Sequence, residues 1–88
     1  MNKLVLNVRI ISPKEDLYNG TALSVSSINS IGKFDILPEH ANFITLVANS
    51  PIIIKTGDGK NLTYTFPLAI IHTSNNEVRI FTDLTITS

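Results

Sequence analysis

The sequence predicts an all-β protein, an antiparallel β-sandwich or flattened barrel of about eight to ten short strands. Apolar and polar residues alternate along many short segments, which is the period of a half-buried strand. Turn-forming residues recur roughly every 8–12 residues, with many β-branched residues between them. Apolar residues do not recur at the helical spacing over several turns in any segment, so we expect no helix.

The first strand is predicted over residues 4–10, where the even positions are apolar while Asn7 and Arg9 face the other way. Residues 12–15 end this strand, because they include a proline, which cannot donate to a strand ladder. Tyr18-Asn19-Gly20 predicts a turn, since Asn and Gly tolerate positive φ.

The later strands follow at short intervals. We expect them over residues 23–28, 31–37, 43–48, 52–56, 62–66, 68–73 and 78–82. Turns are predicted at Asn29-Ser30 and at residues 49–51. Residues 57–60 and 74–77 each join two neighbouring strands and are typical of hairpin loops.

Composition restricts the class of protein. A chain of 88 residues forms a single domain over residues 1–88. Only 16% of the residues are charged, against roughly 25% in average proteins, which indicates surface covered by partners. The formal net charge is zero and no basic cluster occurs, so we expect no nucleic-acid partner. Runs such as residues 68–71 are too short to cross a bilayer, so we expect no direct membrane insertion.

No enzyme chemistry is predicted. Without cysteine there is no thiolate metal site, and His40 and His72 lack an acidic partner at ligand spacing. Residues 57–60 lie between two strands and lack the spacing of a phosphate loop, so no cofactor is expected. Tyr64 and Phe66 alternate on one strand without interleaved basic residues, which favours a place in the core over nucleic-acid stacking.

Residues 31–41 are the most informative segment, because a short apolar strand runs directly into Pro38-Glu39-His40-Ala41. A histidine at a strand end has two interpretations. In the first, its side chain caps the strand end through a hydrogen bond to the nearby backbone. In the second, it contacts a partner protein from a loop that the rigid sandwich holds in place.

These motifs resemble the N-terminal β-sandwich of the epsilon subunit of F-type rotary ATP synthases. The family's Ser-containing turn and its Phe/Tyr-x-Gly turn are matched by Ile10-Ile11-Ser12-Pro13 and Leu17-Tyr18-Asn19-Gly20. Its Gly-x-x-Gly-Ile-x-Pro-x-His-Ala segment is matched by residues 32–41, which is the most specific part. The closing strand that ends in an aspartate is matched by residues 78–83.

The sequence also departs from the family pattern. Asp35 replaces the second glycine, and Phe66-Pro67-Leu68 stands where Ser-Gly-Gly is expected. Lys33 replaces an acidic residue common in the loop that faces the membrane ring, where a like charge would cost about 1 kcal/mol. The sequence ends at Ser88, where the family usually continues into two helices that carry nucleotide binding and inhibition, so neither is assigned to this chain.

The resemblance implies a non-catalytic central-stalk subunit that couples a gamma-like shaft to a membrane ring. It would work in the cytoplasm, peripheral to the inner face of the cell membrane, as part of a hetero-oligomeric ATPase. The expected contacts with the shaft are Ser12, Pro38, His40, Ala41 and Thr45. The expected ring-facing loop is Asn29, Ser30, Ile31, Gly32 and Lys33. A free-standing module that captures a peptide by strand addition at a sheet edge is the alternative.

Overall fold

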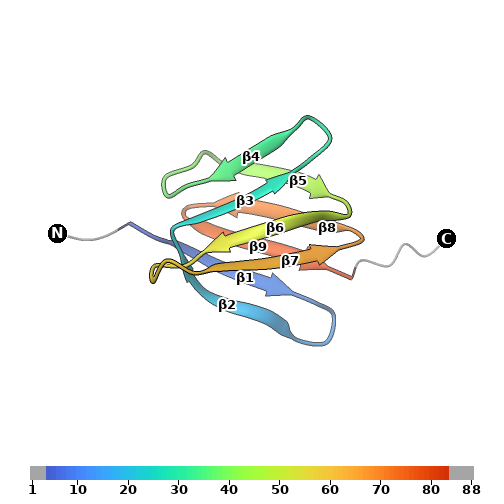
Figure 1. Ribbon diagram of the computed structural model, residues 1–88, viewed down its shortest axis with the longest axis horizontal. Coiled ribbons are helices and arrows are strands. Elements are labelled where there is room, and N and C mark those ends of the chain that lie inside the picture. The colour runs from blue at the N-terminus through green and yellow to red at the C-terminus, as the bar shows by residue number, and fades with distance from the viewer. Residues whose placement is uncertain (1–3, 84–88) are drawn as a thin grey trace.

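The computed structural model describes residues 4–83, which form two sheets stacked face to face (Figure 1). The strands are β1 (Leu6–Ile11), β2 (Asp16–Ala22), β3 (Ser24–Ile28), β4 (Lys33–Ile36), β5 (Phe43–Val47), β6 (Ser50–Lys55), β7 (Asn61–Phe66), β8 (Ala69–Ser74) and β9 (Glu77–Thr82). One sheet has the order β2-β1-β9-β8-β5 and the other β4-β3-β6-β7. Residues 4–83 contain no helix, so none is long and apolar enough to cross a membrane. The predicted all-β sandwich is confirmed.

A single core fills the space between the sheets. It is built from inward-facing residues at alternate positions of the strands, as the period of two predicts. The buried apolar residues, each at most 1% exposed, are Leu6, Val8, Ile10, Ala22, Val25, Ile36, Val47, Ile52, Ile54, Ala69, Ile71, Val78 and Ile80. Both sheets therefore bury one face against the other, and the molecule is a stiff, close-packed body.

Aromatic side chains from the edge strands of the two sheets pack against the borders of the core. Phe34 of β4 and Phe43 of β5 meet with ring centroids 5.4 Å apart. Tyr18 of β2 packs against the core, as do Tyr64 and Phe66 of β7, whose rings stack at 6.1 Å. The expectation that Tyr64 and Phe66 belong to the core is confirmed in part, because both are partly buried and pack against the core.

The predicted hairpin turns between β3 and β4, β6 and β7, and β8 and β9 are confirmed. Asn75 and Asn76 join β8 to β9 with φ of 51° and 62°, which is typical of a type I′ turn. The turn at residues 49–51 is partly wrong, because β6 already begins at Ser50. Pro51 is tolerated there, since the β3–β6 ladder begins only at Ile53.

The turn predicted at Tyr18-Asn19-Gly20 is wrong. These residues lie inside β2, where Asn19 pairs with Arg9 and Gly20 pairs with Val8. Pairing along the whole of β1 outweighs the local turn preference, and the chain reverses instead at residues 12–15. The Tyr18 hydroxyl donates to the Thr21 carbonyl oxygen at 3.1 Å and lies over Gly20. One pairing also departs from the antiparallel expectation, because β1 and β9 run parallel.

Candidate functional site

An apolar row crosses the outer face of the five-stranded sheet. The register places Leu46 of β5 opposite Ile70 of β8, Ile70 opposite Phe81 of β9, and Phe81 opposite Ile11 of β1. These four side chains point away from the core, because the residues beside them along each strand are the buried ones. We call Leu46, Ile70, Phe81 and Ile11 the apolar row.

The apolar row is open to solvent at its β5 end. Leu46 is 58% exposed and the neighbouring Ile44 is 67% exposed. A shallow groove lined by Ser30, Ile44, Thr45, Leu46 and Ile70 lies beside them. Neighbouring apolar side chains exposed on a sheet face are typical of a surface that contacts another protein.

A polar row borders the apolar row on the same face. It contains His72 and Arg79, which lie opposite each other, and Arg9, which lies opposite Arg79 in the parallel pair. Arg9 donates to both carboxylate oxygens of Asp16 at 3.0–3.2 Å, and Arg79 donates to Glu77 at 2.8 Å. Both ion pairs are exposed and contribute little to stability. They neutralise the two arginines, so this face has no strong field of one sign.

Two of the residues expected at the shaft adjoin members of the apolar row along the chain. Ser12 follows Ile11 directly, and Thr45 precedes Leu46 directly. Ser12 belongs to the β1–β2 turn, where its hydroxyl donates to the Glu15 carbonyl oxygen at 2.7 Å. The Thr45 side chain points toward the other sheet, because Ile44 and Leu46 on either side of it face outward and its hydroxyl accepts from Asn29 Nδ2 at 3.1 Å.

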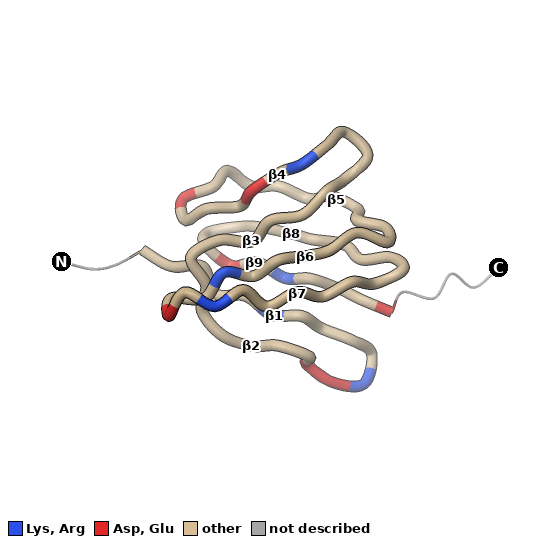
Figure 2. The backbone as a smooth tube through the Cα atoms, viewed as in Figure 1, with Lys and Arg blue, Asp and Glu red and all other residues tan. Residues whose placement is uncertain are grey.

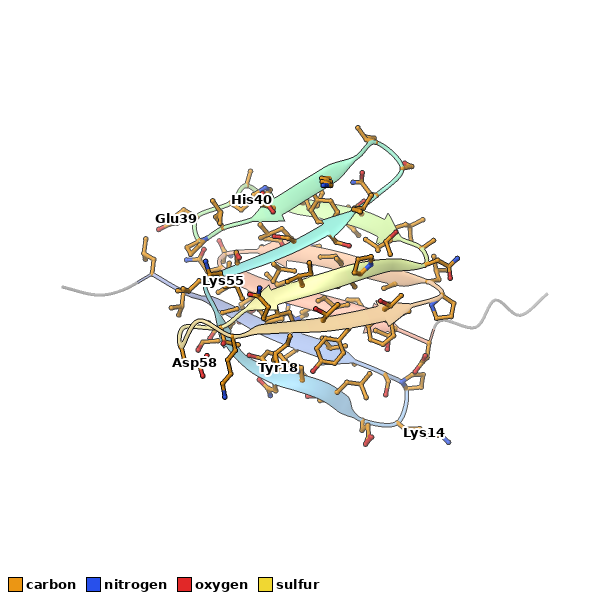
Figure 3. All side chains as sticks on the ribbon, in the orientation of Figure 1. Lys14, Tyr18, Glu39, His40, Lys55 and Asp58 are labelled. Carbon is orange, nitrogen blue, oxygen red and sulfur yellow. The ribbon has the colours of Figure 1, made fainter. Side chains whose placement is uncertain are left out.

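The other three expected shaft residues, Pro38, His40 and Ala41, lie elsewhere. They form the connection from β4 to β5, at the end of the sandwich opposite to the β1–β2 turn (Figure 1). Figure 3 shows His40 at that end and Lys14 at the other. The structure does not bring these three residues together with Ser12.

His40 has local contacts that explain its place. Its backbone N–H donates to the Leu37 carbonyl oxygen at 3.1 Å, and its Nδ1 lies 2.7 Å from the Ala41 carbonyl oxygen. Its ring meets Phe43 edge-on, with centroids 5.5 Å apart. The preceding Glu39 has a φ of 70°, and its N–H donates to Asn76 Oδ1 at 2.6 Å. The local interpretation of His40 is confirmed, and its contact with a partner stays a prediction.

The expected ring-facing residues form the tip of the β3–β4 hairpin. Asn29 and Gly32 exchange backbone hydrogen bonds of 3.0 and 3.2 Å around Ser30 and Ile31. Gly32 has a φ of 147°, which favours glycine although there is open space around it. Ile31 is 95% exposed at the tip, and Lys33 is exposed at the start of β4.

The titratable groups of the described residues do not converge on a reaction centre. No cluster of three or more His, Cys, Asp or Glu side chains occurs in residues 4–83. Burial, with smaller contributions from Tyr64 and Asp58, raises the pKa of Tyr18. Hydrogen bonds from the Thr56 hydroxyl and the Lys60 N–H lower the pKa of Asp58. Asp58 lies in the β6–β7 loop, where charges of both signs meet (Figure 2).

The family is decided by a match over nearly the entire chain. The model of the ATP synthase delta/epsilon chain β-sandwich domain matches residues 5–88. The chain belongs to this family. The resemblance drawn from the sequence motifs is thereby confirmed.

Relatives of known name agree. The chain is 32% identical over 76 residues to the ATP synthase epsilon chain of Clostridium botulinum strain Eklund 17B, covering 86% of this chain and 57% of that protein. It is 31% identical over 58 residues to the ATP synthase epsilon chain of Micrococcus luteus, covering 66% of this chain and 64% of that protein. The chain thus spans less than two thirds of the length of these relatives.

Solved structures show the same fold. A chain of the Euglena gracilis mitochondrial ATP synthase, in a structure of OSCP, F1 and the c-ring, matches with a TM-score of 0.85 and 14% identity. That match covers 96% of this chain and 54% of the other. A chain of the Tetrahymena thermophila central stalk and c-ring matches with a TM-score of 0.72 and 13% identity, covering 93% and 66%.

Sequence reasoning missed the apolar row. Each member stands beside a buried apolar residue in Ile10-Ile11, Leu46-Val47, Ile70-Ile71 and Ile80-Phe81. Such doubled apolar positions break the period of two, and this was the signal that could have revealed an apolar outer face. The alignment of the four pairs into one row depends on the long-range register.

Proposed function

We propose that this chain is a non-catalytic central-stalk subunit of an F-type or F-type-like rotary ATPase, and that its five-stranded sheet packs on a gamma-like shaft. The apolar row is the observation that carries the proposal. It is an apolar surface, open to solvent at its β5 end, on a member of the delta/epsilon family, and two expected shaft residues, Ser12 and Thr45, adjoin its members along the chain. The remaining sandwich is a rigid body, which suits a part that transmits rotation mechanically.

The second contact of this proposal is the β3–β4 hairpin, which faces the membrane ring. Its tip lies at the same end of the sandwich as the β1–β2 turn (Figure 1). One rigid body can then touch the shaft with a sheet face and the ring with a hairpin. The subunit is peripheral to the inner face of the cell membrane, on the cytoplasmic side, and it has no catalytic role.

The family match favours this proposal over a free-standing module that works by strand addition. Strand addition would use an edge strand such as β5, which carries no charged residue. Docking on the sheet face would use residues far from that edge, such as Ile11, which is separated from β5 by β9 and β8. The two modes therefore respond differently to substitutions on β1.

The test is binding of the chain to a gamma-like subunit from the same organism. Burying a leucine is worth about 1.5–3 kcal/mol, so an interface that covers the 58% of Leu46 now exposed gains about 1–2 kcal/mol. Leu46→Glu removes this gain and leaves a charge in the interface, for about 2–5 kcal/mol more. We expect binding to weaken at least about a hundredfold.

Two further variants sharpen the test. Thr63→Glu is the matched control, because Thr63 is exposed on β7 of the other sheet, and we expect it to leave binding unchanged. Ile11→Thr should weaken binding about tenfold if the sheet face docks. Unchanged binding for both Leu46→Glu and Ile11→Thr would overturn the proposal, whereas loss with Leu46→Glu alone would point to the edge of β5.

A further inference from the structure

The side chain of Asn29 makes three hydrogen bonds that organise the hairpin tip. Its Oδ1 accepts from the N–H of Ile31 at 2.9 Å and from the N–H of Gly32 at 3.1 Å. Its Nδ2 donates to the Thr45 hydroxyl oxygen at 3.1 Å. One amide group therefore holds the turn from inside and ties it to a strand of the other sheet.

We propose that Asn29 is a positioning residue, and that Ile31, which it holds in place, is an apolar anchor for the protein that docks on this hairpin. The inference rests on the proposed function, in which that protein is the membrane ring. It adds the chemistry of the contact: an apolar recess in the ring's loops that receives one isoleucine, with neutral or acidic groups beside Lys33.

The exposure of Ile31 supports an apolar anchor. It is 95% exposed, the highest fraction among the large exposed apolar residues of the described chain. Loop tips are usually polar, because an exposed apolar side chain gains nothing from water. A single apolar side chain that enters a pocket often dominates the affinity of an interface.

The charge of the hairpin tip supports the same conclusion. Between Asn29 and Lys33 the only charged residue is the lysine, so the tip offers no carboxylate to a basic partner loop. Attraction must then come from apolar contact, or from acidic groups on the partner. Holding the turn in one shape before docking lowers the entropy lost on binding.

The bond to Thr45 gives the tip a second role. Thr45 precedes Leu46 of the apolar row on β5, and its bond with Asn29 is partly buried. The ring-facing tip and the shaft-facing sheet are therefore joined directly by one hydrogen bond between the two layers of the sandwich.

The positioning role is tested on the chain itself by amide hydrogen exchange at Ile31 and Gly32. Asn29→Ala removes all three side-chain bonds and should speed exchange at Ile31 about two- to tenfold. The effect at Gly32 should be smaller, because its N–H keeps a bond to the backbone carbonyl oxygen of residue 29. Thr45→Val removes only the tie to β5 and should have a smaller effect, whereas Thr45→Ser keeps the hydroxyl and should match the natural chain. Unchanged exchange in Asn29→Ala, or equal rates in Thr45→Val and Thr45→Ser, would overturn this role.

The anchor is tested with the chain bound to its gamma-like subunit, against the purified membrane ring in nanodiscs. Ile31→Ser should weaken docking about tenfold or more, and Asn29→Ala about two- to tenfold. Thr63→Ala, at an exposed position on β7 away from this hairpin, is the control and should leave docking unchanged. If the complex with the shaft forms and Ile31→Ser docks as well as the natural chain, the anchor is wrong and the proposed function stands. If no complex with the shaft forms, the proposed function fails, while the exchange experiment still decides the role of Asn29.

Discussion

Replacing His40 by alanine separates its local role from any role at an interface. The structure assigns the side chain two stabilising contacts, a bond between Nδ1 and the Ala41 carbonyl oxygen at 2.7 Å and an edge-on contact with Phe43. A hydrogen bond contributes about 0.5–1.5 kcal/mol net, and an aromatic contact of this kind a similar amount. We therefore expect His40→Ala to lower the free energy of unfolding by about 1–3 kcal/mol.

The assay is denaturant unfolding of the isolated chain, with thermal unfolding as a second measure. In a domain of this size the loss corresponds to a fall in Tm of roughly 5–20 °C. His72→Ala is the matched control, because His72 lies half-buried on the outer sheet face and its ring makes no hydrogen bond to any described residue. It should cost less than about 1 kcal/mol. Equal losses for the two variants, or none for His40→Ala, would refute the local explanation of His40.

Three further outcomes follow from the backbone and the titrating groups. Glu39→Gly should leave the free energy of unfolding unchanged or raise it by up to about 1 kcal/mol. A non-glycine residue at a φ of 70° costs about 1–2 kcal/mol, and the larger entropy of glycine in the unfolded chain offsets about half of the gain from relieving that strain. A clear loss of stability in denaturant unfolding would contradict the strain at Glu39. Asn76→Gly keeps the positive φ but removes the acceptor of the Glu39 N–H, so it should cost about 1 kcal/mol, whereas Asn75→Gly should cost close to nothing. Because the pKa of Tyr18 is raised in the folded state, that state keeps its proton to higher pH than the unfolded chain, so stability should fall as pH rises through about 10. Tyr18→Phe should flatten this fall, and an unchanged pH profile would count against the burial of the hydroxyl.

The sequence was sufficient for the local parts of the fold. Alternation placed the inward residues of β1, such as Val8 and Ile10, and paired asparagines marked the hairpin between β8 and β9. It was not sufficient at Asn19-Gly20, where a strong turn signal lies inside β2. The turn does not form because these residues pair with β1, and the local preference of a residue for turns contains no information about pairing with a distant strand.

The candidate site likewise has one part that is local in the sequence and one part that is assembled from distant strands. The hairpin tip from Asn29 to Lys33 is a short segment, so the family motif alone could point to it as the ring-facing loop, a role that stays a prediction. The apolar row combines residues from β1, β5, β8 and β9, which are distant in the sequence. Only the register brings them together, so the sequence did not predict the row. The family resemblance pointed only to Ser12 and Thr45, which adjoin it along the chain, and their contact with the shaft stays a prediction.

Cysteine labelling at the apolar row tests the central claim most directly. The chain contains no cysteine, so one introduced thiol reports on one position. A cysteine in place of Leu46 should react rapidly with maleimide in the free chain and become protected in the complete ATPase, whereas a cysteine in place of Thr63 should react in both states. Equal labelling at position 46 in the free chain and in the assembled complex would contradict the docking of this sheet face on the shaft.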